Sequence, residues 1–114
     1  MDIVYNKEKN AEFRKRAAEL VAQMTLEEKV GQTLNWAPGI DRLGIKKYNW
    51  WNEALHGVAR AGVATVFPQA IGLAATFDED FLEEIADAIS TEGRAKFNMQ
   101  QASDDGDIYK GLTF

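Results

Sequence analysis

The sequence predicts a helix-rich fold with few and short strands. Two stretches, residues 9–24 and 79–98, carry the 3.6-residue periodicity of amphipathic helices. Only residues 63–67 are rich enough in β-branched side chains to indicate a buried strand. The chain has 114 residues, of which 46% are hydrophobic and 27% charged, and these values are ordinary for a globular domain. We therefore expect a single domain over residues 1–114.

The first helix, residues 9–24, has one apolar face and one charged face. Its apolar residues are Phe13, Ala17, Leu20, Val21 and Met24. Its basic run at residues 14–16 is flanked by Glu12 and Glu19, which is typical of a solvated helix face. We expect the apolar face to be buried and, with the second long helix, to carry most of the core.

A start signal follows directly. Thr25 and Glu28 have the spacing of a capping box, so a short helix is predicted over residues 26–33. Its inward positions would be Leu26, Val30 and Leu34. Gly31 weakens this helix and indicates close packing against a neighbour.

The middle of the chain is less regular. Pro38-Gly39 predicts a turn, and residues 40–47 are expected to be irregular. The aromatic stretch over residues 48–57 is predicted to form a helical turn in its second half that ends at Gly57. Pro68 would close the buried strand at residues 63–67.

The second long helix is expected to begin after Asp78, a typical N-cap residue. Its predicted buried stripe consists of Phe81, Leu82, Ile85, Ala88 and Ile89. Residues 99–111 are polar and predict a loop. The apolar end at residues 111–114 indicates an interrupted strand.

Composition excludes several classes of function. A net charge of -5 and a sequence pI of about 4.8 argue against nucleic acid and against an anionic membrane surface as partners. The absence of cysteine excludes disulfides and thiolate metal sites. No apolar run approaches the roughly 18 residues of a membrane helix. Residues 1–10 lack the features of a signal peptide, so a cytoplasmic location is expected unless an upstream leader is missing.

Three blocks and the end of the chain carry a resemblance to a known family. Residues 24–32 read MTLEEKVGQ, residues 48–60 read YNWWNEALHGVAR, residues 65–78 read TVFPQAIGLAATFD, and residues 107–114 read DIYKGLTF. Together they resemble the opening of glycoside hydrolase family three, in its β-glucosidase and β-xylosidase branch. The second block is long and unusual in composition, which makes the resemblance specific.

The resemblance implies an α/β fold, the N-terminal part of a (β/α)₈ TIM barrel. A complete barrel takes about 250 residues, so residues 1–114 would form an incomplete domain. Family members are retaining glycosidases that use a nucleophile Asp and an acid/base Glu. The resemblance places both outside this chain. The nucleophile belongs to a Ser-Asp-Trp setting, whereas Ser103-Asp104 is followed by Asp105. We therefore expect no catalytic residue here and no turnover by the chain alone.

The resemblance also implies which residues of this chain contact a sugar. Glu53 matches the family glutamate that faces the terminal sugar, and a carboxylate can accept hydrogen bonds from two adjacent hydroxyls. Trp50 and Trp51 are candidates to cover the apolar face of a pyranose; of the two, we expect one in the core and the other facing the pocket. His56 would hold the segment in place. The alternatives are an ordinary half-exposed acid at Glu53 and a histidine at position 56 that is hydrogen-bonded to backbone.

No metal or cofactor is expected. Glu53 and His56 have the three-residue spacing of a di-metal carboxylate helix, but such a site needs a second pair, and the chain has one histidine. Asp104, Asp105 and Asp107 resemble part of a calcium loop without its bidentate glutamate, so a solvated turn is favoured.

Two functions remain open. The first is part of a β-glycosidase that hydrolyses terminal β-linked glucose or xylose from an oligosaccharide. The second is a non-catalytic, small helical module that binds a sugar or a protein. A partial barrel would leave a strand edge and an apolar face uncovered, which predicts self-association or loose packing. A compact monomer would favour the module.

Overall fold

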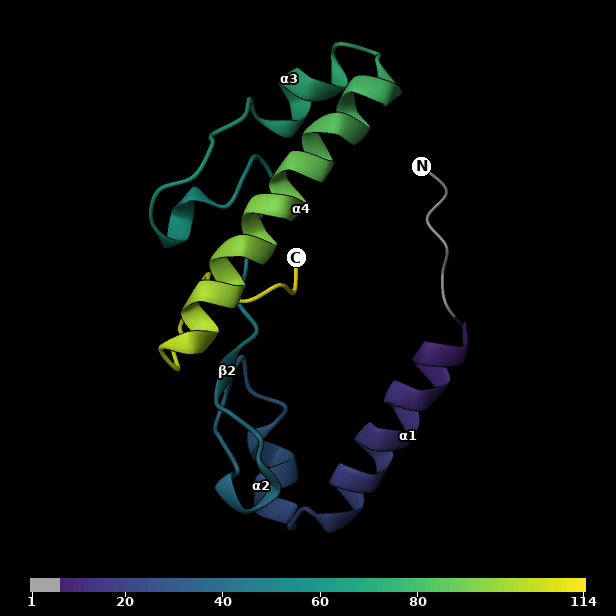
Figure 1. The fold of residues 1–114 in the computed structure, drawn as a ribbon, viewed down its shortest axis with the longest axis vertical. Coiled ribbons are helices and arrows are strands. Elements are labelled where there is room, and N and C mark those ends of the chain that lie inside the picture. The colour runs from purple at the N-terminus through teal and green to yellow at the C-terminus, as the bar shows by residue number, and fades with distance from the viewer. Residues whose placement is uncertain (1–6) are drawn as a thin grey trace.

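The computed structural model describes residues 7–114, and helices dominate it (Figure 1). Its elements are α1 (Lys7–Gln23), α2 (Leu26–Gly31), β1 (Trp36–Ala37), β2 (Tyr48–Asn49), α3 (Ala70–Ala74) and α4 (Glu79–Ala102), with 3₁₀ turns at Asp41–Leu43 and Ala59–Ala61. The strands β1 and β2 pair antiparallel, with Ala37 opposite Tyr48. The prediction of a helix-rich chain with few short strands is confirmed, and this content is consistent with part of an α/β domain.

The predicted helix starts are confirmed where short-range hydrogen bonds decide them. The Thr25 hydroxyl accepts from the Glu28 amide, and the Glu28 carboxylate accepts from the Thr25 amide, which completes the capping box of α2. The Asp78 carboxylate caps α4 by accepting from the amide of Phe81 at 3.0 Å. Helix α4 continues four residues beyond its predicted end at Asn98, so the predicted loop begins after Ala102.

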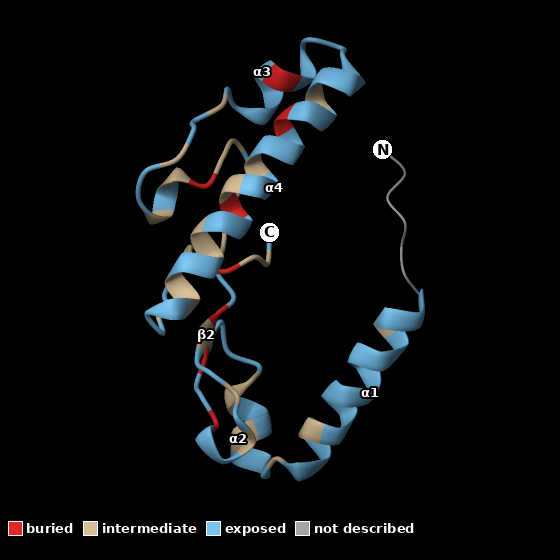
Figure 2. Ribbon diagram, in the orientation of Figure 1, coloured by how far each residue is buried: buried red, intermediate tan, exposed pale blue. Residues whose placement is uncertain are grey.

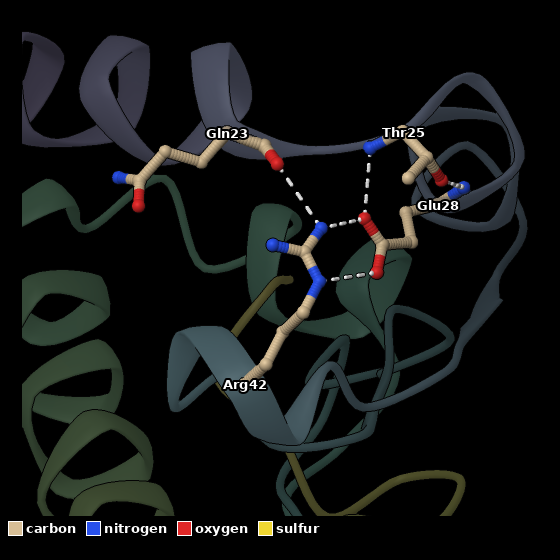
Figure 3. Close-up of polar contacts among 4 residues, drawn as sticks. All are labelled: Gln23, Thr25, Glu28 and Arg42. Carbon is tan, nitrogen blue, oxygen red and sulfur yellow. Dashed lines mark hydrogen bonds and ion pairs between the residues drawn. The ribbon is translucent and has the colours of Figure 1, made fainter.

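An ion pair joins the capping box to the loop that follows α2 (Figure 3). The Arg42 guanidinium donates to both carboxylate oxygens of Glu28 and, at 3.0 Å, to the backbone carbonyl of Gln23 at the end of α1. These hydrogen bonds, from Arg42 first and from the Thr25 amide second, hold the pKa of Glu28 below its ordinary value of 4.5. The Arg42 guanidinium therefore connects the end of α1, the capping box of α2 and the 3₁₀ turn at Asp41–Leu43.

This corner is expected to loosen in acid. Because the folded pKa of Glu28 is lowered, its stabilising effect is complete above the ordinary pKa and is lost as the pH falls through the lowered value. Hydrogen exchange at the Thr25 and Glu28 amides should accelerate, relative to the intrinsic rate, between about pH 6 and about pH 3. In Arg42→Gln most of this pH dependence should vanish. Equal protection factors at both pH values in the wild type would contradict the assignment.

The buried core is small and lies mainly beside α4. Its apolar residues are Ala37, Ile40, Val58, Leu73 and Ile85. The chain is also expanded, because its radius of gyration is 16.9 Å, whereas a compact chain of this length has about 13 Å. Its accessible surface of 8717 Å² exceeds the roughly 6200 Å² of a compact protein of this mass. Loose packing, one of the two predicted outcomes, is thus observed, while self-association stays a prediction.

Helix α1 does not contribute to the core, contrary to the prediction. It contains no buried residue, and Phe13 on its apolar face is 60% exposed. Figure 1 shows α1 projecting away from α2, and Figure 2 shows it mostly exposed, with only Asn10 and Leu20 half-buried. The residues predicted to face inward from α2 are exposed too: Leu26, Val30 and, beyond the helix, Leu34. An amphipathic pattern identifies a face that can be buried, but burial needs a neighbouring element, and none covers these faces within residues 7–114.

Helix α4 confirms its predicted stripe only in part. Ile85 is buried, and Leu82 and Ile89 are half-buried, whereas Phe81 and Ala88 are exposed. The other buried position of α4 is Gly93, a residue that the hydrophobic pattern missed.

The predicted buried strand over residues 63–67 is wrong. No strand forms there, and Val63 is 99% exposed. Side chains of α4 hold this segment as a loop: the Glu92 carboxylate accepts from the amide and the hydroxyl of Thr65, and the Lys96 ammonium donates to the Val63 carbonyl at 3.5 Å. A strand needs a partner strand for its backbone groups, and here side chains of a helix take that place.

Three further local predictions have mixed outcomes: the close contact at Gly31 is confirmed, whereas the turn at Pro38-Gly39 and the strand at the end of the chain are not. Gly31 does mark a close contact, because a Cβ there would lie 3.0 Å from Pro38 Cγ. The turn after β1 lies at the 3₁₀ residues 41–43, closed by the pairing of Ile40 with Ile45, and not at Pro38-Gly39. Residues 111–114 form no strand.

The sequence also led to expectations about membrane-spanning helices and about the location of the protein. Within residues 7–114, no helix is both long enough and apolar enough to span a membrane. The expectation of a cytoplasmic location rests on residues 1–10. Residues 1–6 lie outside the described residues, so that expectation stays a prediction.

Candidate functional site

The segment over residues 48–60, which carries all four predicted site residues, is an irregular strap and not a helix. Between β2 and the 3₁₀ turn at Ala59–Ala61 its backbone has no helical hydrogen-bond ladder, and of the predicted helical turn only one hydrogen bond forms, from the Gly57 amide to the Ala54 carbonyl at 3.4 Å. Gly57 has a φ of 114°, a conformation that L side chains rarely adopt. The backbone groups of the strap bond to remote partners: the Trp50 amide donates to Asn35 at 2.7 Å, and the Trp51 carbonyl accepts from Tyr109 at 3.0 Å. These contacts replace the local helix.

Two asparagines anchor the strap. Asn49 is the one buried polar side chain among the described residues, and its Oδ1 accepts from the Trp51 amide at 2.9 Å. The Asn52 amide group donates to the Asn49 carbonyl at 3.0 Å and to the Thr113 hydroxyl at 2.7 Å. Its oxygen accepts from the Gly111 amide at 2.7 Å. Asn52 therefore joins the strap to the last residues of the chain.

Tyr48 completes the junction with the C-terminal segment. Its hydroxyl accepts from the Leu112 amide at 2.8 Å and lies 3.4 Å from the Thr113 hydroxyl. A Cβ at Gly111 would lie 2.0 Å from the same hydroxyl, so only glycine fits at this position. The strap is thus held in place by residues about 60 positions later in the sequence.

Glu53 and His56 share the same part of the surface. Together they line two surface hollows of about 390 and 260 Å³. The larger hollow also contains Gln69 and the apolar side chains of Leu55 and Ile71. A volume near 400 Å³ is within the range of small-molecule sites, and a carboxylate beside apolar carbon is suited to a polyhydroxylated ring. The structure therefore brings two of the predicted site residues to a common surface.

The two tryptophans do not line either hollow. Trp50 is 51% and Trp51 58% exposed, so the expectation that one of them lies in the core is wrong. Trp50 instead makes an edge-to-face contact with Tyr48, with ring centroids 4.9 Å apart. Their predicted role on a pyranose face stays a prediction.

His56 is hydrogen-bonded to backbone, as the alternative interpretation expected. Its Nδ1 lies 3.0 Å from the Phe67 carbonyl, and the Phe67 amide donates to the His56 carbonyl at 2.9 Å. This double contact fastens the strap to residues 65–67. Among the described residues, no cluster of three or more metal-ligating side chains accompanies it.

The site has two further members that the sequence pattern did not indicate. The Arg60 guanidinium lies 4.0 Å from the Glu53 carboxylate, measured from Nε to Oε2, and donates to the Tyr109 hydroxyl at 3.1 Å. Arg60 belongs to the strap, but Tyr109 is 49 residues away. Both residues lie in blocks that carry the family resemblance, yet no spacing rule could have paired them.

The chain is similar in sequence to several known xylosidases. The chain is 51% identical over 98 residues to the probable exo-1,4-beta-xylosidase xlnD of Neosartorya fischeri, a match that covers 76% of this chain. It is 44% identical over 101 residues to a xylan 1,4-beta-xylosidase of Xylanibacter ruminicola, covering 89% of the chain. It is 46% identical over 110 residues to the probable beta-D-xylosidase 7 of Arabidopsis thaliana, covering 88%.

This chain is a β-xylosidase-like segment. The resemblance drawn from the four sequence blocks is thereby confirmed at the level of a β-glycosidase. The matches span only 12–13% of the length of these relatives. No protein-family model matches the chain, and no solved structure does.

For a β-xylosidase-like chain, the junction between the strap and the C-terminal segment is its best-defined feature. The amides of Gly111 and Leu112 donate to Asn52 and Tyr48 there, and Gly111 makes the close approach to Tyr48, so the junction holds the backbone that carries Glu53 and His56.

Proposed function

We propose that this chain is part of the barrel domain of a retaining β-glycosidase of family three, and that its strap contacts the terminal xylose of a β-linked oligosaccharide. The curated relatives carry xylosidase names, which favours xylose over glucose. The helix-rich content with two short strands is compatible with the first part of a (β/α)₈ barrel.

The position of Glu53 carries the proposal. Its carboxylate is 31% exposed and borders both hollows. The Arg60 Nε lies 4.0 Å from its Oε2, which is beyond hydrogen-bond distance. The two carboxylate oxygens can therefore accept from adjacent hydroxyls of a sugar. This arrangement supports binding and orientation of the sugar ring.

In this proposal the chain supplies binding and not bond cleavage. A retaining glycosidase needs a nucleophile and an acid/base about 5–5.5 Å apart. The family nucleophile follows a serine and precedes a tryptophan, and Ser103-Asp104-Asp105 departs from that pattern. The strap would fix the sugar so that catalytic groups supplied from elsewhere meet it in a productive geometry.

Exposed apolar surface favours this function over that of an independent module. Phe13, Val63, Ile71 and Phe77 are all more than half exposed. An independent module of this size buries such side chains, because burial of apolar surface is the main stabilising contribution to folding.

The test is a sugar titration of the purified 114-residue chain. We expect xylose to shift the amide resonances of the strap in an ¹⁵N spectrum, and Glu53→Gln to raise the dissociation constant about fivefold or more, because a charged acceptor is lost. Glu84→Gln, on the outer face of α4, is the matched control and should leave the affinity unchanged. Glucose should bind more weakly than xylose, and 4-nitrophenyl β-xyloside should not be hydrolysed.

Two outcomes would count against the proposal. If xylose leaves the strap resonances unmoved, or if Glu53→Gln and Glu84→Gln bind it equally well, Glu53 is not a sugar contact. Release of nitrophenol that survives purification to homogeneity would show that the chain holds its own catalytic carboxylates.

A further inference from the structure

We propose that Arg60 is a positioning residue for the Glu53 carboxylate and that Tyr109, from the C-terminal segment, holds Arg60 in place. This inference rests on the proposed function, in which Glu53 is the sugar contact. It extends the site from the strap to a segment 49 residues later in the sequence.

Tyr109 contacts Arg60 in two ways. The Arg60 Nη2 donates to the Tyr109 hydroxyl at 3.1 Å, and the guanidinium carbon lies 4.8 Å from the centre of the Tyr109 ring. One contact is directional, and the other favours a guanidinium placed over the ring. Together they restrict the orientation of a side chain that is otherwise 58% exposed.

Tyr109 is itself held in an unusual conformation. Its φ is 62°, in the left-handed region that non-glycine residues rarely occupy, and its amide donates to the Trp51 carbonyl at 3.0 Å. Such a conformation persists where the surroundings stabilise it. The hydrogen bond to Trp51 fastens Tyr109 to the strap itself, so the tyrosine moves with the segment that carries Glu53.

The contact between Arg60 and Glu53 is long. At 4.0 Å, Nε and Oε2 are too far apart for a hydrogen bond but close enough for attraction between opposite charges. The Tyr109 hydroxyl first, and the charge of Glu53 second, raise the pKa of Arg60, so the guanidinium stays charged. Arg60 thus restricts the carboxylate without occupying the lone pairs that a sugar hydroxyl needs.

Solvent limits the size of the effect. Exposed charges interact weakly in water, so we expect a graded loss and not complete loss of binding. In the xylose titration, Arg60→Gln should raise the dissociation constant about threefold. Arg60→Lys keeps the charge but not the planar contact, and it should fall between wild type and Arg60→Gln. Tyr109→Phe keeps the ring and loses the hydroxyl, and it should weaken binding about twofold.

Arg94 provides the matched control. It is also an exposed arginine beside an aromatic ring, with its guanidinium carbon 5.9 Å from the centre of Phe97. Arg94→Gln should leave xylose affinity unchanged. A second readout needs no sugar: the Nε–Hε resonance of Arg60 should move when Glu53→Gln is introduced and stay in place with Glu84→Gln. A purely structural role for Arg60 would not link its Nε–Hε resonance to Glu53.

The outcomes separate the two proposals. If Glu53→Gln weakens binding while Arg60→Gln matches Arg94→Gln, the positioning role is overturned and the proposed function survives. If the wild type binds no xylose, the proposed function is overturned, and an Arg60 resonance unchanged by Glu53→Gln overturns the positioning role as well. Should Arg60→Gln lose its helical circular dichroism, Arg60→Lys and the resonance measurement decide.

Discussion

Replacement of Gly57 by alanine is expected to lower the free energy of unfolding by about 3 kcal/mol or more, a large loss for a single substitution. Two causes add. The φ of 114° is unfavourable for any residue with a Cβ. The new Cβ would also lie 2.3 Å from the Thr65 carbonyl oxygen, a backbone atom that the Glu92 carboxylate helps to hold in place through the Thr65 amide.

The measurement is urea unfolding followed by tryptophan fluorescence, together with hydrogen exchange at the Phe67 amide. This amide donates to the His56 carbonyl beside Gly57, so its protection should fall first. Gly44→Ala is the matched control, because Gly44 also has a positive φ, of 64°, but has open space around it. It should cost about 1 kcal/mol. Equal losses in the two variants would show that the contact with Thr65 is unimportant.

Replacement of Gly111 by alanine is expected to detach the C-terminal segment from the strap. A Cβ at Gly111 would lie 2.0 Å from the Tyr48 hydroxyl and 2.6 Å from Asn52 Nδ2. Either ring or amide must move, and movement breaks the bonds that Tyr48 and Asn52 make to residues 111–113. Loss of two or three such hydrogen bonds corresponds to about 2–3 kcal/mol.

Hydrogen exchange at Gly111 and Leu112 gives the direct readout, since their amides donate to Asn52 and Tyr48. In Gly111→Ala, residue 111 and Leu112 should lose their protection, and xylose affinity should also fall, because the strap that carries Glu53 loses its contacts through Asn52 and Tyr48. Gly72→Ala, in α3, serves as the control: its Cβ would meet only Pro68 at 3.7 Å, and alanine favours the helix. Unchanged protection of Leu112 would contradict the close approach at Gly111.

Sequence reasoning selected two of the residues that meet at the site and missed others. Glu53 and His56 were carried over from a motif, and they do line common hollows. Arg60, Asn52 and Tyr109 were missed, because each acts through a partner distant in sequence. The left-handed backbone at Tyr109 has no compositional sign, since tyrosine gives no local indication of a positive φ.

Local sequence was sufficient to predict the features that depend on neighbours three or four residues apart: the capping box of Thr25 and Glu28, the Asp78 cap, and the helices α1 and α4. Which helix faces are buried, and where the strap lies, depend instead on contacts between segments that are distant in the sequence. Phe13 lies on the apolar face of an amphipathic helix and stays exposed, because burial requires a covering element. Residues 63–67 have β propensity and form a loop, because strand formation requires a partner strand. Short-range hydrogen bonds can be predicted from local spacing, whereas burial and pairing depend on what the rest of the fold places nearby.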